Sequence, residues 1–163
     1  MTLTVERLRE VLDYDPETGI FRWKIHTGNR AKIGTVAGCK VSNRGYVRIQ
    51  IAPNGPFYAH RLAWLYVYGE WPRGDVDHLN GNKGDNRISN LRCVNRSVNM
   101  QNLKSANKSS KTGFLGVRVD KKKFTASITL NYRPIHLGNF DTPEEAHQAY
   151  LDAKRRLHEG NTL

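Results

Sequence analysis

The sequence has few cysteines and no long apolar run. Only Cys39 and Cys93 occur in 163 residues, so two Cys-x-x-Cys pairs cannot close a structural zinc site, and none is expected. The chain has no apolar stretch of about 18 residues and no basic helix with a clean apolar stripe, which argues against a membrane partner. The opening MTLTVERLREVL has no apolar region typical of a signal peptide. We therefore expect a cytoplasmic protein with reduced thiols, although a disulfide between the two cysteines stays open.

Acidic residues are also scarce relative to basic ones. The chain carries 26 Lys and Arg against 15 Asp and Glu, a formal net charge of +11. Both halves share the excess: residues 1–102 hold 15 basic against 9 acidic side chains, and residues 103–163 hold 11 against 6. Such charge attracts phosphate backbones, so double-stranded DNA is the expected partner. An RNA-directed protein is the rival, but no RNP-type aromatic signature supports it.

The N-terminal part of the chain, up to His60, predicts a helix followed by short antiparallel strands. Apolar residues between Thr4 and Leu12 recur at helical spacing, and turn residues over 13–19 end that helix. Apolar and basic residues alternate over Phe21–Ile25, and alternation returns over Tyr46–Ile51, as expected for half-buried strands. Aromatic, Arg and Lys side chains on these strands are candidates for DNA contact, but half-buried strands of any function alternate in this way.

The following segment, from Arg61 to Leu103, predicts a buried helix, two strands and a short helix. The apolar run Arg61–Tyr68 ends at Gly and Pro residues, as a buried helix does. Strands are expected at Val76–His78 and Leu91–Val94, with a polar loop between them. Asn95 is the expected N-cap of a helix through Leu103.

Polar side chains in this segment suggest hydrolysis of a phosphodiester. Asp77 and Asn99 offer the oxygen ligands that Mg²⁺ prefers, with water and substrate phosphate completing the shell. His78 is able to take a proton from water near neutral pH. Mg²⁺, or Mn²⁺ in its place, is therefore the expected cofactor.

The stretch DHLNGNKGDNRISNLRCVNRSVN resembles the HNH endonuclease motif, in the variant in which the last histidine is an asparagine. The similarity extends upstream through His60-Arg61-Leu62-Ala63-Trp64 and Gly69-Glu70-Trp71-Pro72. The resemblance implies that His78 is the general base and that Asn90 braces the loop. It also implies that Asp77 and Asn99 hold the metal, and that the products carry 5′-phosphate and 3′-hydroxyl ends. Because phage and intron endonucleases share the motif, a phage protein acting in a bacterial host, or a bacterial protein, is expected.

Two simpler interpretations compete at this stretch. Asn-Gly-Asn and Gly-Asp-Asn are ordinary turn chemistry, because Gly, Asn and Asp tolerate positive φ angles. A calcium loop of the EF-hand type would place Leu79 at its third position, where no side-chain oxygen is available, and no Glu closes a loop of the required length.

The C-terminal part of the chain predicts a second module after the linker-like segment KSANKSSKT. Three short strands are expected within 117–138, followed by a helix that opens with Thr142 as cap, Pro143 in the first turn and Glu145 completing a capping box. This half resembles the AP2 DNA-binding domain through Gly116-Val117-Arg118, Phe124-x-Ala126-x-Ile128, Leu137-Gly138-x-Phe140-Asp141-Thr142 and Glu144-Glu145-Ala146-x-x-Ala149-Tyr150. The resemblance implies a three-stranded sheet that enters the major groove. A generic ββα module is the alternative.

Together these observations predict an α+β chain. Residues 1–104 would be an HNH endonuclease domain with a ββα-metal core at about 57–104, and residues 105–163 an AP2-like DNA-binding domain. The expected activity is metal-dependent, site-selective cleavage of DNA; a non-catalytic DNA-binding regulator is the alternative. The expected DNA-contacting residues are Arg87, Arg92, Arg118, Lys121, Lys122, Lys123 and Arg133.

Overall fold

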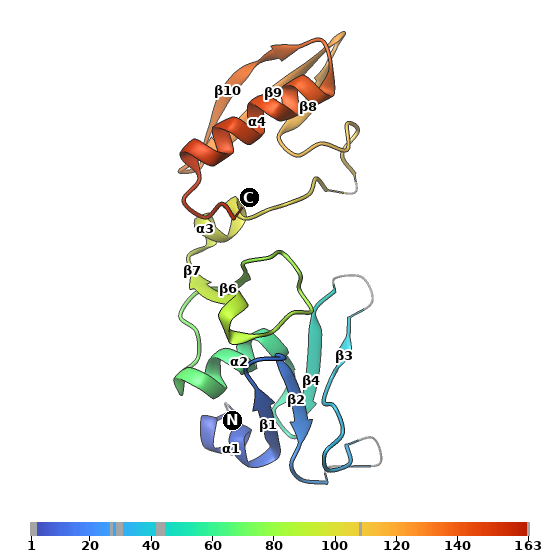
Figure 1. Cartoon of the computed structure of the whole chain (residues 1–163), viewed down its shortest axis with the longest axis vertical. Coiled ribbons are helices and arrows are strands. Elements are labelled where there is room, and N and C mark those ends of the chain that lie inside the picture. The colour runs from blue at the N-terminus through green and yellow to red at the C-terminus, as the bar shows by residue number, and fades with distance from the viewer. Residues whose placement is uncertain (1–2, 27, 29–30, 42–44, 108, 163) are drawn as a thin grey trace. The chain divides into compact units, whose positions relative to one another are not determined.

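The structure, a computed structural model, describes residues 3–26, 28, 31–41, 45–107 and 109–162. The chain divides into two compact units, Met1–Val94 and Asn95–Leu163, each with its own helices and sheets (Figure 1). The elements of the first unit are α1 (Val5–Val11), β1 (Leu12–Asp15), β2 (Ile20–Trp23), β3 (Cys39–Lys40), β4 (Val47–Ile51), β5 (Gly55–Tyr58), α2 (Ala59–Tyr68), β6 (Asp75–His78), the 3₁₀ turn η1 (Ile88–Asn90) and β7 (Leu91–Val94). The second unit contains α3 (Arg96–Gln101), β8 (Val117–Asp120), β9 (Lys123–Leu130), β10 (Arg133–Phe140) and α4 (Pro143–Leu157).

The N-terminal helix continues directly into a β-hairpin. The Thr4 side chain caps α1 by accepting a hydrogen bond from the Arg7 N–H at 3.3 Å. The chain then enters β1, which pairs antiparallel with β2. The sequence indicated only turn residues here, but Leu12 and Tyr14 alternate with Asp13 and Asp15. Burial of the two apolar side chains makes this segment a strand despite its aspartates.

A three-stranded sheet and α2 complete the core of the first unit. The strand order is β3-β4-β5, and Ile49 and Ile51 of β4 are buried. Helix α2 begins at Ala59, slightly before the expected start at Arg61, and ends at Gly69 in the left-handed region, with φ of 78°. The core joins side chains from α1, the β1–β2 hairpin, β4, α2 and the β6–β7 pair.

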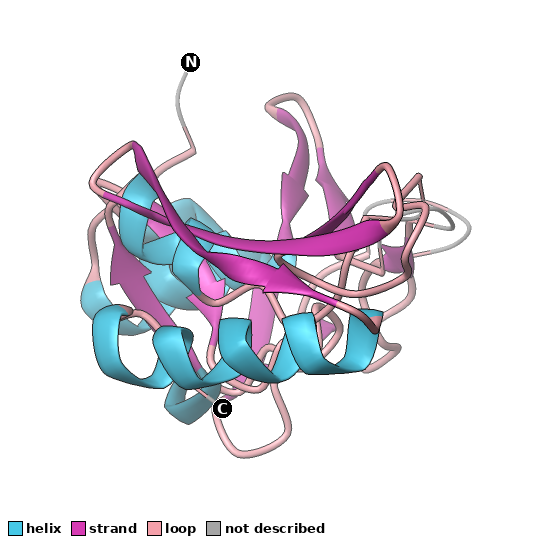
Figure 2. Ribbon diagram, turned by 90° about the horizontal axis from the view of Figure 1, so that it is seen from above, coloured by secondary structure: helices cyan, strands magenta, loops and turns pink. Residues whose placement is uncertain are grey.

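In the second unit, α4 lies along one face of the sheet β10-β9-β8, as Figure 1 shows; Figure 2 presents the same ribbon from above. The sheet contributes Ala126 and Ile128 to the buried contacts, and α4 contributes Ala146, Tyr150 and Ala153. The expected capping box is confirmed: the Thr142 hydroxyl accepts from the Glu145 N–H, and the Glu145 carboxylate accepts from the Thr142 N–H, both at 3.3 Å.

Helix α3 is bonded to the C-terminal segment of the same unit. The Gln101 amide oxygen accepts a hydrogen bond from the Gly160 N–H at 2.9 Å, and the Lys104 ammonium donates to the Thr162 carbonyl at 2.9 Å. The buried Lys154 ammonium donates to the Leu103 carbonyl. The region of α3, expected to belong to the endonuclease core, is therefore held by contacts from the C-terminal end of the chain.

The predicted fold class is confirmed: the described residues form small antiparallel sheets and four helices. Cys39 and Cys93 are both free, so the disulfide left open by the sequence does not form. Within the part of the chain that the structure describes, no helix combines the length and the apolar character needed to cross a bilayer.

Candidate active site around His78

The β6–β7 pair brings Asp77 and His78 to neighbouring positions at the end of β6. Asp77 lies opposite Arg92 and His78 opposite Leu91 in the antiparallel register. Successive side chains of a strand point to opposite faces, so the carboxylate and the imidazole leave β6 on different sides. Asp77 is 8% exposed and His78 is 4% exposed. The two groups expected to do the chemistry are therefore set in a strand, where the backbone has little freedom.

Asn90 holds both ends of the loop that follows β6. Its side-chain oxygen accepts from the Asn80 N–H at 3.0 Å, and its amide nitrogen donates to the Asp85 carbonyl at 2.8 Å. Its own carbonyl accepts from the Leu79 N–H at 2.9 Å. These bonds close the loop immediately after His78. They are the contacts that a bracing role for Asn90 requires.

Asn86 contacts His78 directly. The side chain of Asn86 is buried, and its amide oxygen lies 3.2 Å from Nε2 of the His78 ring. The amide nitrogen of Asn86 donates to the Gly84 carbonyl at 3.3 Å. The sequence indicated only turn chemistry for Asn86, whereas its side chain in fact contacts the candidate base.

The His78 ring also contacts a cluster of aromatic side chains. Its ring centroid lies 5.1 Å from that of His60 in an edge-to-face arrangement, and 6.0 Å from that of Tyr46. Tyr46 and Tyr58 lie within 5.6 Å of the His60 ring. Burial lowers the pKa of His78, against the opposing effects of the Asn86 hydrogen bond and the Asp77 charge. A neutral imidazole near pH 7 follows, as a proton acceptor requires.

His60 is the most strongly perturbed titratable group of this cluster. Burial, with smaller contributions from His78 and Arg61, lowers the pKa of His60 to about 3. Nδ1 of His60 is buried and has no hydrogen-bond partner among the described residues. His60 is part of the segment that carries the HNH resemblance, but the sequence alone indicated no role for it.

Arg92 and Arg87, both expected to contact DNA, are engaged by carboxylates of this unit. Nε and Nη2 of Arg92 donate to Oδ2 of Asp77 at 3.1 and 2.9 Å. Nε and Nη2 of Arg87 donate to the two oxygens of Asp85 at 2.8 and 2.6 Å. Hydrogen bonds from Arg87 lower the pKa of Asp85 to about 2.

The donor chemistry of Asp77 fits a hard divalent cation. A carboxylate offers about four lone-pair sites and supplies the oxygen donors that such a cation prefers. Among the described residues, no three His, Cys, Asp or Glu side chains gather as an all-protein metal centre would need. Asp77 with one amide oxygen would thus bind Mg²⁺ or Mn²⁺ together with water and substrate phosphate.

Asn99 lies in α3 and therefore in the second unit. The expected N-cap of this helix is confirmed, because the Asn95 side chain accepts from the Val98 N–H at 2.9 Å. The backbone N–H of Asn99 donates to the Asn95 carbonyl at 3.0 Å, within the first turns of α3.

The basic residues expected to read DNA occupy different sides of the C-terminal sheet. Cross-strand partners share a face. Arg118 pairs with Thr125 and Lys123 with Asp120, on the face opposite α4. Arg133 pairs with Leu130, which shares the α4 face with Ile128. Arg133 therefore lies on the same side of the sheet as α4, whereas Arg118 and Lys123 lie on the opposite side.

Exposed lysines stand at the β8–β9 turn, and further polar residues lie on the face opposite α4. Lys121 and Lys122 are exposed at the β8–β9 turn, whereas Lys123 forms an ion pair with Asp141 at 2.8 Å. His136 pairs with Ser127 and Asn139 with Thr125, so both also lie on the face opposite α4. A bulge between His136 and Gly138 interrupts the alternation of β10. The sequence pattern alone therefore does not place these two side chains on one face.

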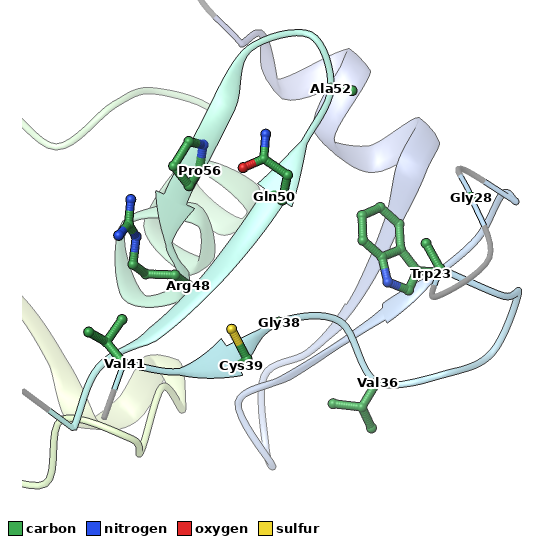
Figure 3. Close-up of a pocket in the computed structure, with 11 residues that line it drawn as sticks. Trp23, Gly28, Val36, Gly38, Cys39, Val41, Arg48, Gln50, Ala52 and Pro56 are labelled. Carbon is green, nitrogen blue, oxygen red and sulfur yellow. The ribbon is translucent and has the colours of Figure 1, made fainter. Parts of the chain in front are cut away.

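A separate groove of about 860 Å³ lies on the β3–β4–β5 sheet of the first unit (Figure 3). Arg48 and Gln50 of β4, Cys39 of β3 and Pro56 of β5 line it, with Trp23 at its side. The described residues that line this groove include none of those predicted for catalysis or metal binding, and no carboxylate. They offer no means of hydrolysing a phosphodiester, and His78 remains the candidate centre.

Comparison with known proteins supports this choice of centre. Residues 57–101 match the model of a family described as HNH endonuclease. No curated protein and no solved structure matches the chain. The matched segment runs from β5 through α2, the β6–β7 pair and α3, and so includes His60, Asp77, His78, Asn90 and Asn99. This family indicates a nuclease that acts on DNA.

Proposed function

We propose that the chain is a metal-dependent, site-selective DNA endonuclease whose centre is His78. The observation that carries the proposal is the pair formed by a buried His78 and Asp77 at the end of β6, within a segment that matches an HNH endonuclease family. A protein that only binds DNA has no need of a buried imidazole and a buried carboxylate at consecutive positions of one strand.

His78 is proposed as the general base. Its burial lowers its pKa, so the ring is neutral at physiological pH and able to take a proton from a water molecule in line with the scissile phosphorus. Asn90 is proposed to keep the following loop closed, because its side chain bonds backbone groups at both ends of that loop.

Asp77 and Asn99 are proposed to hold Mg²⁺ or Mn²⁺. When bound, such an ion stabilises negative charge on the phosphate and on the leaving 3′ oxygen. Arg92 orients the Asp77 carboxylate through its two hydrogen bonds to Oδ2. We assign Arg87 a similar role, which is to orient the Asp85 carboxylate with which its guanidinium is paired.

The second unit is proposed to bind double-stranded DNA through the sheet face opposite α4. Its resemblance to the AP2 domain and its sheet with one helix behind it support this role. Arg118, with Lys121 and Lys122 at the turn, would supply phosphate contacts or base readout.

Cleavage of supercoiled plasmid DNA with Mg²⁺ tests the activity. Wild-type protein should cut, and His78→Ala should cut at least about 100-fold more slowly, because loss of a general base typically costs about that much. His26→Ala is the matched control, since His26 is an exposed histidine of the same unit. A folded wild-type protein that binds duplex DNA but never cuts it would favour the non-catalytic regulator.

A further inference from the structure

The hairpin formed by β1 and β2 contacts the loop that carries Asn86. The hydroxyl of the buried Tyr14 donates a hydrogen bond of 2.7 Å to the Asn86 backbone carbonyl. The Ile88 N–H donates to the Pro16 carbonyl at 3.3 Å. Burial raises the pKa of Tyr14, so its hydroxyl stays protonated and remains a donor near neutral pH. The loop is thus attached to a hairpin that lies far earlier in the chain.

Gly19, in the turn of the same hairpin, fixes how closely the two segments approach. Its φ is 71°, and a Cβ atom placed on it would lie 2.5 Å from the Asn86 carbonyl carbon and closer still to the Arg87 backbone nitrogen. Such a separation is far below van der Waals contact. The backbone of Asn86 therefore lies directly against the hairpin turn, at a position only glycine allows.

The side chain of Asn86, whose backbone is fixed in this way, contacts the His78 ring. Its amide nitrogen donates to the Gly84 carbonyl, so its oxygen is the atom that faces Nε2 of His78, at 3.2 Å. Exchanging the oxygen and the nitrogen of this amide would instead set two acceptors against each other at Gly84. An amide oxygen only accepts hydrogen bonds, so Nε2 carries the proton and the lone pair of the neutral ring lies on Nδ1.

We propose that Asn86, anchored by Tyr14 and Gly19, is the positioning residue that holds His78 in the Nε2–H tautomer and makes Nδ1 the atom that accepts the proton from water. This inference rests on the proposed nuclease function. A base held in the opposite tautomer would present an N–H to the water and be unable to take its proton. The N-terminal hairpin then serves the reaction through the loop that it anchors.

The tautomer is measurable without DNA or metal. In protein labelled with ¹⁵N at histidine, at about pH 8 where an ordinary imidazole is neutral, the His78 resonances should show a proton on Nε2 and none on Nδ1. Asn86→Leu should give a mixture of tautomers, whereas Asn86→Asp, which keeps an oxygen acceptor, should restore the Nε2–H form. Retention of a pure Nε2–H ring in folded Asn86→Leu would overturn the role of Asn86.

Kinetics supply the second readout. Asn86→Leu should lower kcat by about 100-fold or more with an unchanged KM for DNA, because it removes the alignment of a general base. Tyr14→Phe, which removes one hydroxyl, should lower kcat by about 2- to 10-fold. Tyr66→Phe is the matched control, since its hydroxyl is 3.5 Å from Asp13 and belongs to the same aromatic cluster as Tyr14.

Equal effects of Tyr14→Phe and Tyr66→Phe on kcat would overturn the anchoring step. An unchanged kcat in folded Asn86→Leu would overturn the positioning role while leaving the nuclease assignment intact. Absence of cleavage by the wild-type protein would instead remove the proposed function, and the ¹⁵N measurement would still decide whether Asn86 sets the tautomer.

Discussion

Arg92 and Asp77 face each other across the β6–β7 pair, and the guanidinium of Arg92 donates twice to one carboxylate oxygen of Asp77, at 3.1 and 2.9 Å. Both side chains are mostly buried, with 25% and 10% of their surfaces exposed. The strand register therefore places a fixed positive charge beside the carboxylate proposed to bind a metal.

Removal of the Arg92 charge should increase the amount by which Mg²⁺ raises the thermal midpoint of the protein. Arg92→Ala removes two guanidinium hydrogen bonds from the buried Asp77 carboxylate, and weaker pairing of a buried charge is costly. We expect a lower thermal midpoint than wild type without metal, and a larger upward shift of that midpoint when Mg²⁺ is added. Arg87→Ala, which breaks the pair with Asp85, is the control and should respond to Mg²⁺ like wild type. The same Mg²⁺ shift in wild type and Arg92→Ala would argue against Asp77 as a ligand.

Asn90→Ala should lower both the free energy of unfolding and the rate of cleavage. The substitution removes the side-chain partners of the Asn80 N–H and the Asp85 carbonyl, and a typical hydrogen bond of this kind contributes about 0.5–1.5 kcal/mol. Urea unfolding provides the free energy, and plasmid cleavage the rate. Asn82→Ala, at an exposed position in the same loop, should change the free energy of unfolding far less. A fully stable Asn90→Ala protein would contradict the bracing role.

His60 should make the protein sensitive to acid. Its folded pKa is lowered to about 3, from 6.5 when exposed, so the unfolded chain binds the proton first as pH falls. Stability is therefore complete above about pH 6.5 and declines from there toward pH 3, by up to ~1.4 kcal/mol per pH unit for this one group. His60→Phe should show a shallower decline between about pH 7 and pH 5 in urea unfolding. Identical pH profiles for wild type and His60→Phe would mean that His60 is protonated in the fold.

Truncation after Leu103 should abolish cleavage rather than only relax its selectivity. A modular enzyme divided at residue 104 would keep its activity, because Asp77, His78, Asn90 and Asn99 all precede the cut. The truncated chain, however, lacks Lys154, Gly160 and Thr162, which bond the segment from α3 to Lys104. A helix this short is unstable on its own. Circular dichroism and cleavage assays of the truncated protein provide the test. Full metal-dependent cleavage by the truncated protein would show that cleavage does not depend on the residues after Leu103.

The salt dependence of DNA binding should reveal which face of the C-terminal sheet meets DNA. Replacement of Lys121 and Lys122 with Ala should reduce the slope of log K against log salt by about 0.9 for each phosphate that is no longer neutralised. Replacement of Arg155 and Arg156 on α4 removes the same charge from the other side of the sheet. Equal changes from the two double variants would mean that the effect is one of net charge alone.

Elements with a local cause, such as periodicity or capping, were predicted best from the sequence. The Thr142 capping box and the Asn95 cap depend on side chains that bond groups within the next helical turn, and both are confirmed. Strand β1 was missed because Asp13 and Asp15 resemble turn residues, and only burial of Leu12 and Tyr14 makes the segment a strand.

The candidate site was predictable only in part, because some of its contacts join segments that are far apart in the chain. Asp77, His78 and Asn90 follow from a motif contiguous in sequence. Two contacts join separate segments of the chain: that of Asn86 with Tyr14 and that of His60 with His78. No local sequence pattern predicts either contact. Arg133 shows the same difficulty, because the side of the sheet it faces depends on a register set by the Asn131–Tyr132 turn.

The hydrogen bond between Tyr14 and Asn86 spans 72 residues, and this has a consequence for how the protein is made. Contacts of such high sequence separation form late, after the intervening chain has been closed into a loop. During synthesis, a ribosome-bound chain that ends before residue 86 has no means of fixing the His78 imidazole. The proposed hydrolytic activity would therefore not appear before nearly the whole first unit has emerged and folded. Until then, the nascent polypeptide would not be able to cleave DNA.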